Sequence, residues 1–136
     1  MIESSIVTYQ NQIIDYSSGV PTSVEFNFER VWEFKKSLNE DFQPHLLNFY
    51  HVHPEGFNTY SELDKICMKG FFIAFGYSIY FAIITFSGND LFDITARYSA
   101  FEYTKDGINK TGVEYLTKDQ LLFLKFLSYG DSVEAL

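Results

Sequence analysis

The sequence has little cysteine and little positive charge, and both shortages restrict what the protein can be. Cys67 is the only cysteine among 136 residues, so the chain cannot form an internal disulfide, and nothing indicates an oxidising compartment. Its 18 Asp and Glu residues outnumber its 10 Lys and Arg residues, which gives a net charge of −8. A chain this acidic is a poor candidate for binding a phosphate backbone, so we expect no nucleic-acid partner.

The sequence predicts neither a targeting segment nor a membrane span. Its first residues contain no basic stretch followed by an apolar run, so they do not predict a signal peptide. Residues 70–88 carry no charge, which is long enough to consider a membrane span, but Gly76 and several Tyr, Ser and Thr residues interrupt them. A buried helix end followed by a buried strand explains this segment better. We therefore expect a cytoplasmic protein with no membrane partner.

Material for a hydrophobic core is abundant, with 46% hydrophobic and 19% aromatic residues. The length predicts a single domain over residues 1–136. Apolar runs predict strands at residues 6–9, 12–16, 46–53, 77–86 and 91–103, with a further candidate at 23–26. Helical spacing predicts helices at residues 28–42, from about 61 to 75 and at 117–127, followed by a frayed tail at 128–136. Strands mixed with helices in this order predict an α+β, or mixed α/β, fold.

Two of these helices carry sequence signals for their starts. The tetrapeptides at residues 59–62 and 117–120 both match the capping-box pattern, in which a Ser or Thr precedes Glu or Gln by three residues. Gly76 is a natural residue to end the middle helix. Gln10 and Asn11 lie between two β-branched runs, which predicts a hairpin turn there.

The motif with the most chemical content is HVHP at residues 51–54, followed by Ser61 and Asp64, a pattern of H-x-H-P-x(6)-S-x-x-D. Residues two apart on a strand share a face, so His51 and His53 can present both imidazoles to one point. Ser61 and Asp64 are three apart at a helix start and also share a face. Two imidazoles and one carboxylate with an open fourth position form the ligand set of a catalytic zinc site. Ser61 would lie beside the open position, where it could hydrogen-bond a developing oxyanion.

These residues resemble the signature of the JAMM (MPN+, or JAB) zinc metalloproteases. That family cleaves peptide or isopeptide bonds, often at the C-terminus of ubiquitin or a ubiquitin-like protein. All five fixed positions and every gap agree, although Val52 stands where the family usually has a small hydroxyl residue. The resemblance implies zinc ligands His51, His53 and Asp64, and an oxyanion role for Ser61.

The resemblance has consequences for the fold and the activity as well. It implies a curved mixed sheet flanked by helices, with cytidine deaminase-like layering. It also implies a hydrolase that acts on a protein or peptide substrate, with ubiquitin-like proteins among the candidates. An extended substrate would lie along an exposed strand edge, where main-chain hydrogen bonds can hold it.

A zinc peptidase also needs a group that takes a proton from water and passes it to the leaving amine. In the family this group is a glutamate on an early strand, and two residues are candidates here. Glu3 heads the first expected strand, whereas Glu25 lies next to the start of the first helix. Glu3 fits the order of elements better, and Glu25 is the alternative. The family usually has a further helix before this glutamate, and the chain leaves no room for one before Glu3.

A function of another class is also consistent with the sequence. Many proteins with this fold are scaffolds, so the chain could be a non-catalytic binding or assembly module, or a module that holds zinc without a working base. The complete metal motif favours the enzyme. The discriminating feature is whether Glu3 or Glu25 reaches the metal site.

Overall fold

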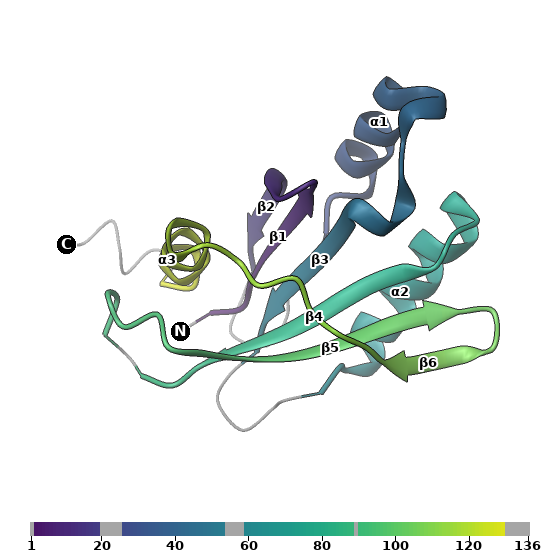
Figure 1. Cartoon of the computed structure of the whole chain (residues 1–136). Coiled ribbons are helices and arrows are strands. Elements are labelled where there is room, and N and C mark those ends of the chain that lie inside the picture. Colours follow the sequence, from purple (N-terminus) through teal and green to yellow (C-terminus); the bar gives the residue numbers. More distant parts are fainter. Residues whose placement is uncertain (1, 20–25, 54–58, 89, 130–136) are drawn as a thin grey trace.

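A six-stranded mixed sheet forms the framework of the protein. The computed structural model describes residues 2–19, 26–53, 59–88 and 90–129. The strands are β1 (Ser4–Tyr9), β2 (Gln12–Ser18), β3 (Leu47–Val52), β4 (Ile79–Phe86), β5 (Ala96–Thr104) and β6 (Gly107–Lys110). They are ordered β2-β1-β3-β4-β5-β6 (Figure 1), with β3 and β4 parallel and all other neighbours antiparallel. The predicted α+β class with a mixed sheet is confirmed.

Among the residues that the structure describes, three α-helices cover the two faces of this sheet, and the sheet divides the core in two. Helices α1 (Phe28–Leu38) and α2 (Glu62–Phe75) pack on one face, against Val7, Phe49 and Phe81 among others. Helix α3 (Lys118–Leu127) packs on the other face, against residues that include Ile6 and Tyr50. Because strand residues alternate between faces, β1 and β3 each contribute to both cores.

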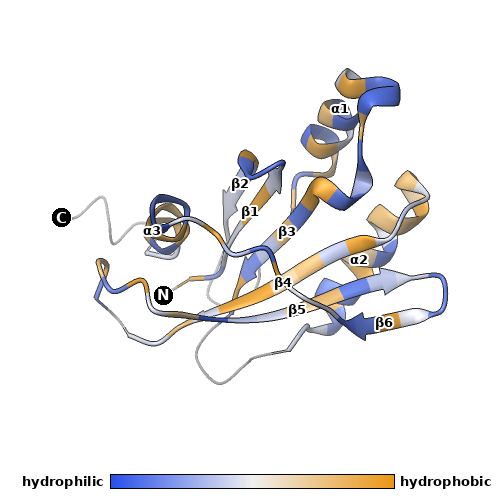
Figure 2. Cartoon of the chain, viewed as in Figure 1, coloured by the Kyte–Doolittle hydropathy of each residue, from blue (hydrophilic) through white to orange (hydrophobic). Residues whose placement is uncertain are grey.

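Strands β3 and β4 lie at the centre of the sheet and are buried on both faces. Every residue of β3 except one is buried, and β4 is largely hydrophobic along its length (Figure 2). Parallel strands covered on both sides have this composition. In β3, Phe49 and His51 face α2, whereas Tyr50 and Val52 face α3. The sheet therefore directs the histidine motif towards the α2 side.

Several predicted boundaries are wrong, and each has a local cause. Helix α1 ends at Leu38 instead of continuing to residue 42, because Asn39 has a φ of 51° and terminates it. Strand β5 begins at Ala96 instead of residue 91. The side chains of Asp90 and Asp93 accept backbone N–H groups from residues 92 and 95, which holds this segment in turns. Of the candidate strand at 23–26, residues 23–25 lie outside the described part and residue 26 is not in a strand.

Two turn predictions have different outcomes. The hairpin at Gln10 and Asn11 is confirmed, since both residues have positive φ angles, 50° and 67°, as the tight turn between β1 and β2 requires. Strand β6 was not expected. Its sequence, GINK, is short and polar, with only Ile108 packed against the core, so it has no alternating pattern to detect.

The predicted frayed tail at residues 128–136 is wrong at its first residue. Ser128 ends helix α3 and is fully buried, and its backbone N–H bonds to Leu124 O and Lys125 O. Packing against β1 orders this position, which local sequence could not reveal. Residues 130–136 lie outside the described part of the chain.

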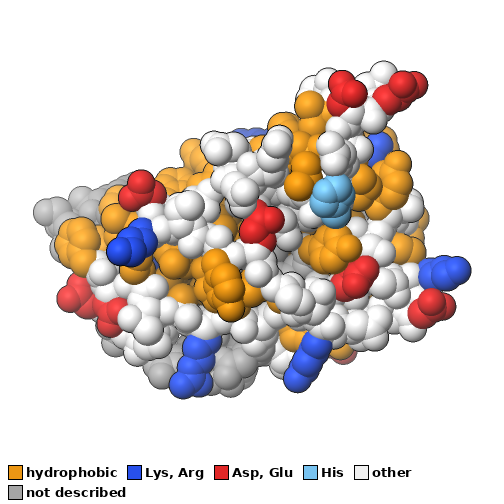
Figure 3. Space-filling model, in the orientation of Figure 1, with side chains coloured by type: hydrophobic (Ala, Val, Ile, Leu, Met, Phe, Trp, Pro, Cys, Tyr) orange, Lys and Arg blue, Asp and Glu red, His pale blue; other side chains and the backbone are white. Residues whose placement is uncertain are grey.

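The face of the molecule drawn in Figure 3 has mixed character. On the face in Figure 3, acidic and basic side chains are dispersed among hydrophobic ones, and the basic side chains do not gather into a single patch. Within the described ranges, none of the helices has the length and apolar character that crossing a membrane requires.

Candidate metal centre

The pairing of strands β1 and β3 brings Glu3, His51 and His53 together. The two strands are antiparallel with Ser5 opposite His51, so Glu3, two residues earlier, lies opposite His53 on the same face. His53 follows the last residue of β3, and its backbone N–H still bonds to Ile84 O of β4 at 3.0 Å. All three side chains are buried, with 6% exposure for Glu3, 2% for His51 and 6% for His53.

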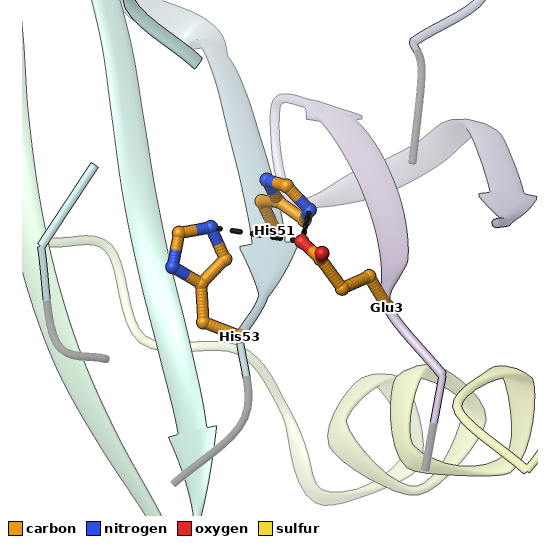
Figure 4. Close-up of side chains that lie close together, drawn as sticks. All are labelled: Glu3, His51 and His53. Carbon is orange, nitrogen blue, oxygen red and sulfur yellow. Dashed lines mark ion pairs between the residues drawn. The ribbon is translucent and has the colours of Figure 1, made fainter. Parts of the chain in front are cut away.

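The side chains of Glu3, His51 and His53 converge (Figure 4). Glu3 Oε1 lies 2.7 Å from His51 Nε2 and 3.8 Å from His53 Nε2. One donor atom from each residue lies within 4.8 Å of the other two, so this buried group could hold a metal ion. A carboxylate with two imidazoles suits zinc, copper, iron or nickel, and the donor set alone does not select among them.

Asp64 adds a second carboxylate to the same cluster. Its Oδ1 lies 2.7 Å from His51 Nδ1, and its Oδ2 lies 3.0 Å from His53 Nε2. Asp64 and Glu3 therefore approach opposite nitrogens of the His51 ring but the same nitrogen of His53. Asp64 is 3% exposed, in the first turn of α2.

The start of α2 fixes Asp64 in place. Ser61 is the N-cap residue: its hydroxyl accepts the Asp64 N–H at 3.1 Å, and Asp64 Oδ2 accepts the Ser61 N–H at 2.8 Å. The predicted capping box at residues 59–62 is therefore wrong by two residues. The Ser61–Asp64 pair begins the helix because Asp64 also gains contacts with the histidines. The Ser61 hydroxyl proton is not used by the cap, and the residue is exposed.

Burial and close ionic contacts have opposite effects on the pKa values of His51 and Asp64. Burial would lower the pKa of His51, but its contacts with Asp64 and Glu3 outweigh burial and raise the pKa above its ordinary value. Burial would likewise raise the pKa of Asp64, but its bonds with His51, His53 and the Ser61 N–H hold that pKa well below its usual range. Two buried carboxylates thus favour positive charge between them.

The His51 ring supplies a direct sign that the cluster suits a cation. His51 Nε2 is buried and forms an ion pair with Glu3 Oε1 at 2.7 Å, which helps to raise the pKa of the ring but does not satisfy the geometry of a hydrogen bond. A buried ring nitrogen that faces a carboxylate, with a second imidazole nearby, fits a site that takes a metal ion.

Each predicted site residue can now be located. Glu3, His51, His53 and Asp64 lie in one buried cluster, and Ser61 caps the helix that carries Asp64. Glu25, the alternative base, lies outside the described residues. No sequence signal gives Phe26 a role, but the centroid of its ring lies 6.2 Å from that of the His51 ring, and it packs edge-on against Phe49 and Phe81. No local pattern could have revealed this contact, because it joins segments distant in the sequence.

Comparison with known proteins adds nothing to this picture: no protein-family model and no curated protein matches the chain. The chemistry of the centre is therefore inferred from its own residues.

Proposed function

We propose that this protein is a zinc-dependent metallopeptidase or isopeptidase, with His51, His53 and Asp64 as zinc ligands. One observation carries the proposal: two imidazoles and two carboxylates from three separate elements are buried in contact, next to a helix N-terminus. Nitrogen and oxygen donors of this kind are typical zinc ligands. The resemblance of the H-x-H-P-x(6)-S-x-x-D motif to the JAMM signature supports the same reaction class.

Glu3 and Ser61 have separate roles in this proposal. Bound zinc lowers the pKa of a coordinated water and polarises a carbonyl. The Glu3 carboxylate would take a proton from the attacking water and later deliver it to the leaving amine, which fits its position beside both histidines. The Ser61 hydroxyl would donate to the developing oxyanion, since the cap uses it only as an acceptor.

The edge of β5 offers a place for an extended substrate. Strand β6 pairs with residues 101–104 only, so residues 96–99 have no strand on their outer side within the described ranges. A groove of about 500 Å³ borders this edge, lined by Thr59, residues 98–101 and residues 110–111. Ser99 is the register neighbour of Ile83, which in turn neighbours His51. A peptide paired with this edge would be held by main-chain hydrogen bonds. It would lie level with the metal centre, because Ser99, Ile83 and His51 are direct neighbours across the sheet.

The experiment that tests the function is Glu3→Gln, with Glu62→Gln as its matched control. Glu62 is an exposed acid in the first turn of α2, outside the cluster. Glu3→Gln should retain about one zinc per chain and lose about 10²- to 10⁴-fold in turnover, the usual contribution of a general base. Glu62→Gln should behave as wild type. Turnover is measured on a panel of ubiquitin-like fusion proteins and plain peptides, with and without a chelator.

A specific observation favours a second candidate, a metal-binding module without a working base. Glu3 contacts both histidines directly, so Glu3 could itself be a ligand and leave no carboxylate free to move a proton. Asp64 would then orient the ring of His51 through Nδ1. Loss of zinc from Glu3→Gln, with no cleavage by wild type across the panel, would establish this alternative. Full turnover in Glu3→Gln would eliminate Glu3 as the base.

A further inference from the structure

The C-terminal end of α3 contacts the segment that carries Glu3. The two segments are far apart in the sequence, since Ser4 and Ser128 are separated by 124 residues. Ile2 donates its backbone N–H to Ser128 O at 2.7 Å. The hydroxyl oxygens of Ser4 and Ser128 lie 2.7 Å apart, and each lies 3.1 Å from Leu124 O. The residues on both sides of Glu3 are thus bonded to the last turn of the helix.

These contacts lie on the opposite face of the sheet from the metal centre. Ser4 and Ile6 face α3, whereas Glu3 and Val7 face α1 and α2, because neighbouring strand residues point in opposite directions. Fixing Ser4 from one face therefore fixes the direction of the Glu3 side chain on the other. Ser4 and Ser128 are both fully buried, so water cannot replace their mutual hydrogen bond.

Glu3 also sits at the end of a strand, where a chain would otherwise fray. Its backbone carbonyl accepts the Gly19 N–H at 2.9 Å, which ties it to the neighbouring segment after β2. The pairing of β1 with β3 ends at Ser5, two residues after Glu3. Pairing with β2 continues to Ser4, opposite Ser18, and the helix contacts at Ile2 and Ser4 add a second attachment on either side of Glu3.

We propose that Ser4 and Ser128 form a positioning pair, which couples the docking of α3 to the placement of the Glu3 carboxylate against His51 and His53. This inference rests on the proposed function, in which Glu3 acts on the metal-bound state of the centre. It extends that function by making the last turn of α3 part of the support of the site. Neither serine touches the histidines.

The test compares Ser4→Ala/Ser128→Ala with Ser18→Ala. Ser18 is the matched control, because its hydroxyl donates to Leu127 O of the same helix end at 2.9 Å but belongs to β2. Each protein is loaded with Co²⁺, whose visible absorption reports the geometry around the ion. Turnover is measured in parallel on the panel described above. Ser128→Thr, which keeps the hydroxyl, serves as the rescue variant, and Ser4→Ala alone replaces the double variant if that variant does not fold.

The expected result has three parts. The double variant binds one Co²⁺ per chain, its spectrum moves in the direction produced by Glu3→Gln, and its turnover falls about 10- to 100-fold, the range for groups that orient metal-site residues. Ser18→Ala keeps the wild-type spectrum and rate, and Ser128→Thr recovers both. A double variant that matches Ser18→Ala, while Glu3→Gln differs, would overturn the positioning pair alone. No spectral or kinetic effect of Glu3→Gln itself would remove Glu3 as the proposed base, and the positioning pair with it.

Discussion

Helices α2 and α3 begin with the same local device but differ in what that device touches. Ser61 and Asp64 close a capping box at α2, and Thr117 and Gln120 close one at α3. In both, a hydroxyl accepts an N–H and the residue three positions on returns a bond to the cap. The two helix starts are therefore equivalent in backbone terms.

Their surroundings are not equivalent. The Asp64 carboxylate is buried and extends to His51 and His53, whereas the Gln120 amide is partly exposed and donates to Asn11 O at 2.6 Å. One cap therefore contributes a charge to a buried cluster, and the other only ties a helix to a turn. A capping motif specifies where a helix begins, but the neighbours supplied by the fold decide whether its side chain does chemistry.

The largest expected effect separates Asp64 from Gln120, the residues at position N3 of the two helices. Asp64→Asn keeps the size of the side chain but replaces a charged ligand by a neutral amide. Zinc affinity should fall by more than about 100-fold, beyond the effect of groups that only orient ligands, and turnover should vanish. Competition with a chromogenic chelator measures the affinity. Gln120→Ala should bind zinc like wild type, and unchanged zinc affinity in Asp64→Asn would leave Glu3 as the carboxylate ligand.

The next effect separates the two N-cap residues. Ser61→Ala should lower turnover by about 10²-fold, because it removes a donor to the oxyanion. It should also cost about 1 kcal/mol of stability through loss of the cap. Steady-state kinetics and thermal unfolding measure the two quantities on one preparation. If Ser61→Ala and Thr117→Ala changed turnover equally, Ser61 would be a cap and nothing more.

The third expected effect is a pH dependence of zinc affinity, which involves the cluster at the start of α2 and not the start of α3. A metal ligand must be a neutral imidazole, and the pKa of His51 is raised in the metal-free protein, so protons compete with zinc. Zinc affinity should fall as the pH decreases through that raised pKa, by up to about tenfold per pH unit for each proton displaced. Chelator competition from about pH 8 down to about pH 5.5 spans the range in which imidazoles titrate. The Thr117–Gln120 box contains no group that titrates there. A zinc affinity that stays constant over this range would show that His51 is not a ligand.

The smallest effect concerns α3 alone. Thr117→Ala removes the hydroxyl that accepts the Gln120 N–H and should cost about 1 kcal/mol, which lowers Tm by about 4 °C. Zinc content and turnover should stay at wild-type levels. Differential scanning calorimetry and elemental mass spectrometry check both points. Loss of zinc in this variant would mean that α3 supports the metal centre through its start as well as through its end.

Much of the candidate site could be proposed from the sequence because its spacing is local. The two-residue separation of His51 and His53 places both imidazoles on one side of a strand, and the three-residue separation of Ser61 and Asp64 defines a helix turn. These periodicities hold in any fold that contains the elements. The same local patterns predict the capping box at residues 59–62, because they cannot weigh the contacts that Asp64 gains with the histidines.

The role of Glu3 could not be decided in the same way. Its distance from the histidines depends on antiparallel pairing of β1 with β3, and its flanking residues depend on a helix that lies more than 100 residues later. Long-range pairings of this kind leave no periodic signal. Ser128 illustrates the limit, since a residue expected in a frayed tail is fully buried against Ser4.

Most of the elements, the mixed α+β class and the chemical types gathered in the motif follow from the sequence, because periodicity, caps and spacing act within a few residues along the chain. Only the tertiary structure decided that Glu3 meets His51 and His53, that Asp64 contacts both rings, and that the end of α3 holds the segment around Glu3. Those contacts arise when the sheet pairs distant strands and the two cores exclude water, and burial then turns ordinary ionic contacts into a site that favours a cation.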